Sequence, residues 1–355
     1  MQNAFVYEPN NGRILFGAGY LQKLSEEASR LQLRNVLVLT TPGKQAQGRE
    51  VLELLGENRA TLFAEARMHT PVEVTERALA VVTKHDIDGV VAIGGGSTTG
   101  LAKAIALRTD LPQIIIPTTY AGSEVTPILG ETRDGVKSTQ RTLKVLPEVV
   151  IYDVRLSLGL PVPLSVASGL NAIAHAAEAL YARDRNPVTS MMAEEAVRTL
   201  VSALPRIVAD PLDEPARGEA LYGAWLCGTC LGSVGMALHH KLCHTLGGTF
   251  DLPHAETHSV VLAHALAYTL PSADQARSVL SRVFGGRDPA LALYEFAKTL
   301  GAPISLRQLG MPEGGIDRAA DLAVQNPYWN PRPIERDAIR ALIARAWAGV
   351  APAND

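Results

Sequence analysis

Cysteine and aromatic residues are scarce in this sequence. Its 355 residues include three cysteines, and aromatic side chains make up 5% of the total. Three cysteines are too few for a disulfide framework, so the reducing cytoplasm is the expected location. Cys227 and Cys230 form a CxxC, but no second CxxC follows that would complete a zinc site. The pair lies in an apolar run, so we expect both cysteines to be buried in a helix.

Long hydrophobic runs and a strong excess of one charge are also missing. No apolar run reaches the roughly 18 residues that a membrane span needs, and the start of the chain lacks the basic-then-apolar order of a secretion signal. The formal net charge of −3 gives no electrostatic reason to expect a nucleic-acid partner. The sequence therefore predicts an ordinary globular protein whose partner is neither a membrane nor a nucleic acid.

The two halves of the chain have different patterns. Up to about residue 155, helical runs alternate with short β-branched runs, at 35–40, 88–94, 112–117 and 148–153. This alternation predicts a parallel, Rossmann-like sheet with helices on both faces. Ala- and Leu-rich helical segments follow. We therefore expect an α/β domain over residues 1–160 and an all-helical domain over 161–355, with the boundary near Pro161 and Pro163.

Three consecutive glycines mark one candidate binding loop. Gly94, Gly95 and Gly96 end the strand predicted at 88–94 and lead through Ser97 into a helical run. Glycine lets a backbone approach a ligand closely, and the first amides of a helix attract phosphate, so we interpret this turn as a phosphate cradle with Ser97 as the helix cap. The motif is not GxGxxG, and a plain tight turn is the alternative.

A second loop, residues 116–126, leaves the strand predicted at 112–117. It offers the hydroxyls of Thr118, Thr119 and Ser123, whose ordinary role in a loop would be turn formation. Ligands of open α/β sheets bind at the carboxyl ends of strands, where this loop and the glycine turn would meet. The combination favours cofactor contacts.

Histidine is concentrated in one stretch of the second half. Six of the nine histidines fall between residues 239 and 264. Asn171 and His175 are four residues apart, as are His240 and His244, so each pair would share one face of a helix. A further histidine, His254, follows a proline. Glu178 lies on the same helix face as His175. Such side chains can close around one point, and the alternative is a set of buried core histidines.

These motifs occur in the order typical of one family. GGGS after a strand, PTTxxGSE, a helical histidine motif, HxxxH and a further Pro-His resemble the iron-containing alcohol dehydrogenases, over about residues 5 to 350. The resemblance implies a dehydroquinate synthase-like architecture: a nucleotide-binding α/β domain, a helical metal-binding domain, an active site in the cleft between them, and a homodimer. By position, His175, His240 and His254 match family metal ligands, and His244 matches a histidine next to the chemistry.

Two departures from the family pattern indicate a branch of it. Asn171 stands where the family has a metal-binding aspartate, and Gly100 stands where it has an aspartate near the nicotinamide. With the late segment at 326–333, these features resemble the maleylacetate reductase branch. That branch uses NADH or NADPH to reduce the C=C bond of maleylacetate, in some members chloromaleylacetate, to 3-oxoadipate in aromatic-compound degradation.

The departures suit an anionic substrate on physical grounds. Loss of two carboxylates removes repulsion against a dicarboxylate, an effect of about a kcal/mol or more for each close contact. An amide is a weaker metal ligand than a carboxylate, so iron or zinc held by His175, His240, His254 and Asn171 is weakened and is not expected to be required. These four side chains would line the pocket and stabilise an enolate, and His244 would donate the proton.

Two other functions fit parts of the pattern. One is a metal-dependent alcohol or polyol dehydrogenase that acts on a neutral substrate. The other is a non-catalytic nucleotide sensor built on the same fold. Stoichiometric metal and chelator sensitivity would favour the first, and absence of any reductase activity would favour the second.

The resemblance also assigns cofactor contacts. It implies that the pyrophosphate is bound by Gly95, Gly96, Ser97 and Thr98, the nicotinamide and its ribose by Thr118, Thr119 and Ser123, and the ribose also by Lys137. Thr41 follows the strand predicted at 35–40, where NAD-selective relatives have an aspartate. No acid at this position repels a 2′-phosphate, so we predict that NADPH is accepted as well as NADH.

Overall fold

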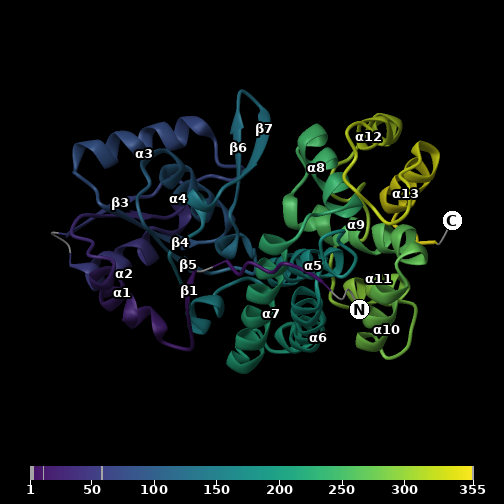
Figure 1. Ribbon diagram of the computed structural model, residues 1–355, viewed down its shortest axis with the longest axis horizontal. Helices are drawn as coiled ribbons and strands as arrows, with labels where there is room; N and C mark the ends of the chain where they lie inside the picture. The colour runs from purple at the N-terminus through teal and green to yellow at the C-terminus, as the bar shows by residue number, and fades with distance from the viewer. Residues whose placement is uncertain (1–3, 11, 57–58, 354–355) are drawn as a thin grey trace. The chain divides into compact units, whose positions relative to one another are not determined.

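The structure, a computed structural model, describes residues 4–10, 12–56 and 59–353 (Figure 1). The chain divides into two compact units: Pro9–Leu160, and Pro161–Asp355 together with Met1–Glu8. The first unit is built around a parallel sheet, and the regular elements in the described residues of the second are all helices. The predicted fold class is therefore confirmed.

A six-stranded parallel sheet forms the centre of the first unit, in the order β1-β8-β5-β4-β2-β3. Its strands are β1 (Arg13–Phe16), β2 (Val36–Leu39), β3 (Ala60–Phe63), β4 (Gly89–Gly94), β5 (Gln113–Pro117) and β8 (Val149–Tyr152). The four runs predicted as strands correspond to β2, β4, β5 and β8. The sequence does not reveal β1 and β3 because these edge strands are only partly buried and lack a continuous apolar run.

Helices cover both faces of this sheet. α1 (Leu24–Arg30) and α2 (Gln45–Leu55) share one apolar core with alternate strand residues such as Val38 and Val91. α3 (Val72–Lys84) and α4 (Gly96–Thr109) lie on the opposite side (Figure 1). Intervening strand residues such as Leu37 and Val90 are also fully buried. Burial on both faces explains why the central strands are apolar without alternation.

An antiparallel hairpin follows the β5 loop. β6 (Ile128–Arg133) and β7 (Val136–Arg141) are joined at Asp134 and Gly135, which both have left-handed φ angles, 51° and 75°. An Asp-Gly pair suits such a tight hairpin turn. Lys137 pairs with Thr132 in this hairpin, but its side chain lies outside the described residues.

The second unit consists of helices joined by short turns. They are α5 (Val162–Ala179), α6 (Pro187–Ala209), α7 (Glu214–Ser233), α8 (Leu238–Phe250), α9 (His254–Thr269), α10 (Asp274–Val283), α11 (Pro289–Thr299), α12 (Ile316–Ala323) and α13 (Arg336–Ala348). α5 begins directly after Pro161, and Pro163 lies in its first turn, where the fixed φ of proline suits a helix start. Cys227 and Cys230 are free and buried in α7.

No single helix among the described residues is long and apolar enough to cross a membrane. α7 and α8 meet the length and composition criteria only as a pair, which is bent by 95°.

Candidate active site

The glycine turn lies where the order of the sheet reverses. The chain runs from β2 outwards to β3 and then returns to β4 on the other side of β2. β2, β4 and β5 are adjacent and parallel, so the segments that begin at Thr41, Gly95 and Thr118 leave the same edge of the sheet. The Thr118 amide donates to the Gly94 carbonyl at 2.8 Å. Ligands of open α/β sheets bind at such a reversal.

The turn from β4 into α4 presents backbone to this edge. Gly94 has a φ of +146°, and a Cβ there would lie 2.8 Å from Thr98 Oγ1. Nothing lies within 4 Å of the position that a Cβ on Gly96 would take. α4 begins at Gly96 with Gly95 as its N-cap, so the prediction that Ser97 caps the helix is wrong. Because no side chain caps α4, its first amides remain available to a phosphate.

The hydroxyls of the two loops are used differently. Thr98 is buried, and its Oγ1 donates to the Gly95 carbonyl at 2.9 Å, so this hydroxyl stabilises the turn. Thr119 packs against Gly95, where a Cβ would lie 2.9 Å from its Cγ2. Ser123 Oγ is buried without a hydrogen-bond partner in the described part of the chain. A buried hydroxyl without a partner is unfavourable, so a polar ligand would be stabilised there.

Lys103 is a buried residue of this unit that the sequence analysis does not single out. Its Nζ donates to the carbonyls of Ser123, Thr126 and Ile128 at 2.6, 2.6 and 2.9 Å, which ties the second loop to α4. Burial lowers the pKa of Lys103 to about 7, against the opposing effect of the Glu124 carboxylate. The feature of the sequence that could have revealed Lys103 is its position as a single lysine in the apolar middle of a helix.

Gly100 lies on α4 directly against Thr70. A Cβ at position 100 would lie 2.2 Å from Thr70 Oγ1, so no side chain fits there unless Thr70 moves. His69 and Thr70 have left-handed φ angles of 64° and 48°, a conformation that is strained for a β-branched residue. The Thr70 carbonyl accepts from the Thr132 amide at 3.2 Å. A threonine hydroxyl thus occupies the space that an acidic side chain at position 100 would need.

Helices α5, α8 and α9 of the second unit bring together most of the predicted catalytic residues. We call the following set the histidine cluster: Asn171 and His175 of α5, His239, His240 and His244 of α8, and His254 and His258 of α9. The ring centroids of His175 and His240 are 5.1 Å apart, those of His240 and His244 are 6.0 Å apart, and those of His254 and His258 are 4.4 Å apart. His244 is half-buried, and His254 is exposed as the first residue of α9.

Glu178 supplies a carboxylate in this region, and both of its oxygens already accept hydrogen bonds within the protein. It accepts from the backbone amides of Ala237 and His239 at 2.8 and 2.7 Å, and its Oε2 lies 2.7 Å from His240 Nδ1. The two amides belong to the start of α8, so Glu178 anchors that helix to α5. A carboxylate only accepts, so His240 carries its proton on Nδ1 and turns Nε2 away. The sequence places Glu178 on the correct helix face but does not predict this role.

Four polar atoms of the histidine cluster are buried without hydrogen-bond partners in the described residues. They are Asn171 Oδ1, His175 Nδ1, His240 Nε2 and His258 Nε2. Each such atom costs about 1–3 kcal/mol unless something pairs with it, so their concentration indicates a ligand site. Burial, with the neighbouring imidazoles His240, His254 and His244, lowers the pKa of His175 well below its usual range. The His175 ring is therefore neutral at physiological pH.

Tyr328 gives His244 a partner from the far end of the chain. Its hydroxyl lies 3.3 Å from His244 Nδ1, and Lys241 Nζ lies 5.9 Å from the centre of its ring. Burial and the Glu178 carboxylate raise the pKa of Tyr328, so the phenol keeps its proton and can donate to Nδ1. A neutral His244 then presents Nε2–H. Tyr328 belongs to the segment at 326–333, whose sequence alone predicts no role for this residue.

The geometry of the histidines bears on metal binding. Within the described residues, His239, Cys243 and His258 form a compact group of potential metal ligands. Their ligand atoms all lie within 4.8 Å of one another. His175, His240 and His254 do not form such a group there. The three histidines at the family's metal positions are therefore near one another but do not form a compact ligand set.

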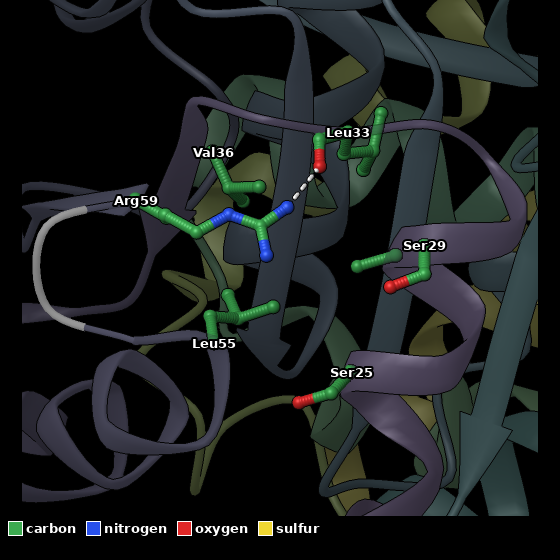
Figure 2. A pocket seen from close by; sticks show the side chains of 7 residues that line it. Ser25, Ser29, Leu33, Val36, Leu55 and Arg59 are labelled. Atoms are coloured by element: carbon green, nitrogen blue, oxygen red, sulfur yellow. Dashed lines mark hydrogen bonds between the residues drawn. The ribbon is translucent and has the colours of Figure 1, made fainter.

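A small cavity in the first unit is unrelated to these groups. It has a volume of about 70 Å³ and is lined by residues of α1, β2 and α2, with Arg59 at its edge. Figure 2 shows the Arg59 guanidinium donating to the Leu33 carbonyl, at 2.7 Å. None of the predicted site residues lines it.

Comparisons with known proteins cover almost the whole chain. Residues 11–154 match the model of the iron-containing alcohol dehydrogenases, and residues 165–347 match that of the C-terminal part of the same family. Maleylacetate reductase from Rhizobium sp. (strain MTP-10005) is 57% identical over 98% of this chain and 99% of its own. Maleylacetate reductase from Burkholderia cepacia is 54% identical over 99% of both chains. The crystal structure of maleylacetate reductase from Agrobacterium tumefaciens superposes with a TM-score of 0.95 at 57% identity, covering 99% of this chain and 100% of that one.

Proposed function

The chain belongs to the iron-containing alcohol dehydrogenase family, and we propose that it reduces the carbon–carbon double bond of maleylacetate to give 3-oxoadipate. As a member of this family it is an NAD(P)H-dependent oxidoreductase that acts on a small molecule. The observation that carries the substrate assignment is the histidine cluster. It offers several buried polar atoms without partners in the described residues, a neutral Asn171, and one carboxylate, Glu178, whose oxygens already accept hydrogen bonds from two amides and His240.

The proposed reaction adds a hydride and then a proton. A bound dihydronicotinamide would supply the hydride, with its electron pair, that adds to the double-bond carbon remote from the ketone. The π electrons move to the ketone oxygen, which becomes an enolate, and a proton then adds to the carbon beside the ketone. Donors positioned at the developing oxyanion supply most of the rate gain in such reactions. Asn171, His175 and His254 are the residues that would surround it, while His240, which turns an Nε2 lone pair to the pocket, would line the pocket without donating.

His244 is the proposed proton donor. It is half-buried, so it can reach both substrate and solvent, and Tyr328 holds its Nδ1. With Nδ1 accepting from the phenol, the proton on Nε2 is the one available for transfer. Histidine suits this role because its ordinary pKa lies close to physiological pH.

A metal ion fits the residues at the family's metal positions poorly. The fourth ligand is the neutral amide of Asn171, and His175, His240 and His254 do not form a compact ligand group in the described residues. His240 Nε2 does point away from Glu178 with a free lone pair, as a metal-binding histidine would. One such residue does not make a site, so we propose that iron or zinc is not required.

The cofactor is proposed to bind along the sheet edge of the first unit. Gly95, Gly96 and Ser97 would contact the pyrophosphate, while Thr98 supports the turn with its hydroxyl. Thr118, Thr119 and Ser123 would contact the nicotinamide and its ribose, and Ser123 Oγ lacks a partner in the described part of the chain. Lys137 remains proposed as a ribose contact from the resemblance alone. Half-buried Thr41 carries no charge, so both NADH and NADPH are proposed as donors.

Two further proposals complete this assignment. We propose a homodimer, from the resemblance to the family, which size-exclusion chromatography with light scattering would test. We also propose a cytoplasmic location, since the three cysteines are free and buried.

The deciding experiment follows NADPH and NADH absorbance with maleylacetate, with and without a chelator, alongside metal analysis of the same sample. Oxidation of the cofactor at one equivalent per substrate, unchanged by chelator, supports the proposal. Stoichiometric metal and activity only on neutral alcohols or polyols would instead identify a metal-dependent alcohol dehydrogenase.

A further inference from the structure

His258 is a central residue of the histidine cluster to which the proposed reaction gives no role. It lies on α9 and is fully buried, with ring centroids at 4.4 Å from His254, 5.0 Å from His240 and 6.5 Å from His175. Its Nε2 is buried without a partner in the described residues, as are His175 Nδ1 and His240 Nε2. His258 therefore adds one more unpaired atom to the same group.

The other side of the His258 ring is held by His239. His239 Nε2 lies 3.0 Å from His258 Nδ1, and His239 is fully buried on α8. One proton occupies the contact between them. If His239 donates it, His258 carries its own proton on Nε2.

His240 and His258 then have complementary roles. His240 gives its Nδ1 proton to Glu178, so its neutral ring presents a lone pair at Nε2. A lone pair does not bind a carboxylate, whereas an N–H does. A pocket for a dianion needs donors, and His258 is the buried residue positioned to supply one.

We propose that His258 is a further substrate-contacting residue, which donates from Nε2–H to a carboxylate of the substrate. His239 is then a positioning residue, because its donation to Nδ1 fixes this tautomer. The inference rests on the proposed function in taking the ligand to be a dicarboxylate. No residue at the family's metal positions is needed for it.

A bound metal is the competing explanation for these side chains. His239, Cys243 and His258 have ligand atoms within 4.8 Å of one another, and Cys243 Sγ lies 3.6 Å from His239 Nε2. Stoichiometric metal in the purified protein that is lost in Cys243→Ser would overturn the inference.

The test uses two variants of His258, each of which keeps a polar group at one of the two ring-nitrogen positions. In His258→Asn, the amide reaches the Nδ1 position and keeps a group for His239 to bond, but nothing occupies the Nε2 position. In His258→Gln, the longer side chain places an N–H near the Nε2 position. The control is His264→Asn, which replaces a buried histidine of the same helix that lies outside the histidine cluster. Affinity for maleate, a simple dicarboxylate, is measured by calorimetry, and KM and kcat are measured with maleylacetate.

The two variants are expected to differ. His258→Asn should weaken maleate binding and raise KM about ten- to a hundredfold, with a smaller effect on kcat and none on the dissociation constant of NADPH. His258→Gln should keep most of the affinity, and His264→Asn should match the wild type. His239→Leu should resemble His258→Asn, whereas His239→Gln, which retains a donor, should restore binding. A purely structural role would lower thermal stability in all of these variants without this pattern.

Each result has a definite meaning. Unchanged maleate affinity in His258→Asn, or equal losses in His258→Asn and His258→Gln, overturns the inference while the reductase function stands. If His258→Asn does not fold, the His239→Leu and His239→Gln pair decides in the same way. Maleate binding that depends on His258 in a protein that does not reduce maleylacetate overturns the proposed function and supports the inference. A wild type that binds no dicarboxylate overturns both.

Discussion

The two units of this chain offer different chemical groups to a ligand: backbone amides in the first unit and side chains in the second. In the first unit, glycines and an uncapped helix offer backbone amides, and most side chains of the turn support one another. In the second, buried imidazoles and an amide side chain keep polar atoms without partners in the described residues. Backbone groups recognise a feature that many ligands share, such as a pyrophosphate, whereas a set of side chains can match one substrate. Under the proposed function, the general and the specific parts of recognition are therefore separated along the sequence.

The largest expected effect comes from removing the proposed proton donor. His244→Ala should lower kcat roughly a hundred- to ten-thousandfold, because a positioned acid contributes about that much. The dissociation constant of NADPH, measured by fluorescence titration, should stay unchanged if the two units recognise their ligands separately. A variant that keeps near-normal turnover would remove His244 from the mechanism.

Acid should destabilise the protein through the buried histidines of the second unit. The pKa of His264 is lowered to about 4 from an ordinary value of 6.5, mainly by burial. In the unfolded chain, His264 therefore binds a proton below about pH 6.5, whereas in the folded chain it binds one only below about pH 4. The free energy of unfolding consequently falls as the pH drops through this range. His264 alone accounts for about 3 kcal/mol, and His175, His239 and His258 act in the same direction.

This acid sensitivity is measurable by thermal melts between pH 7 and pH 4. His264→Gln should flatten the decline of the melting temperature over this range. An identical pH profile in the variant and the wild type would show that His264 does not resist protonation in the folded state.

Two neighbouring glycines should separate cofactor binding from folding in the first unit. Gly96→Ala adds a methyl group where nothing lies within 4 Å, so it should leave the melting temperature unchanged and raise the dissociation constant of NADPH about tenfold or more. Gly94→Ala forces a side chain onto a φ of +146° and against Thr98, so it should lower stability by about 1 kcal/mol or more. Maleate affinity should be normal in Gly96→Ala, and cofactor binding by that variant at wild-type strength would argue against a phosphate cradle.

The smallest expected effect concerns the choice between the two cofactors. Thr41→Asp introduces an acid at the end of β2 and should reduce kcat/KM for NADPH several-fold relative to NADH, because the carboxylate repels a 2′-phosphate. The wild type should use both cofactors. A wild-type preference for NADH above about a thousandfold, or over 4 kcal/mol, would contradict this prediction.

The sequence predicts the architecture of the protein better than its contacts. β2, β4, β5 and β8 are predictable because strands buried on both faces form continuous apolar runs. Helical spacing likewise predicts that Asn171 and His175 share a helix face with Glu178. The partner of Glu178, however, lies 62 residues further along the chain, and that of His244 lies 84 residues further. No local pattern encodes such pairings, so the roles of Glu178, Tyr328 and Lys103 emerge only from the folded chain.

The contact between Thr70 and Gly100 limits how this sequence can evolve. With a Cβ at position 100 only 2.2 Å from the threonine oxygen, an aspartate does not fit there unless Thr70 moves. Conversely, the strained backbone at Thr70 is relieved most easily by glycine, which would leave a gap beside α4. The two positions are therefore coupled: a side chain fits at position 100 only if residue 70 changes its conformation or its identity.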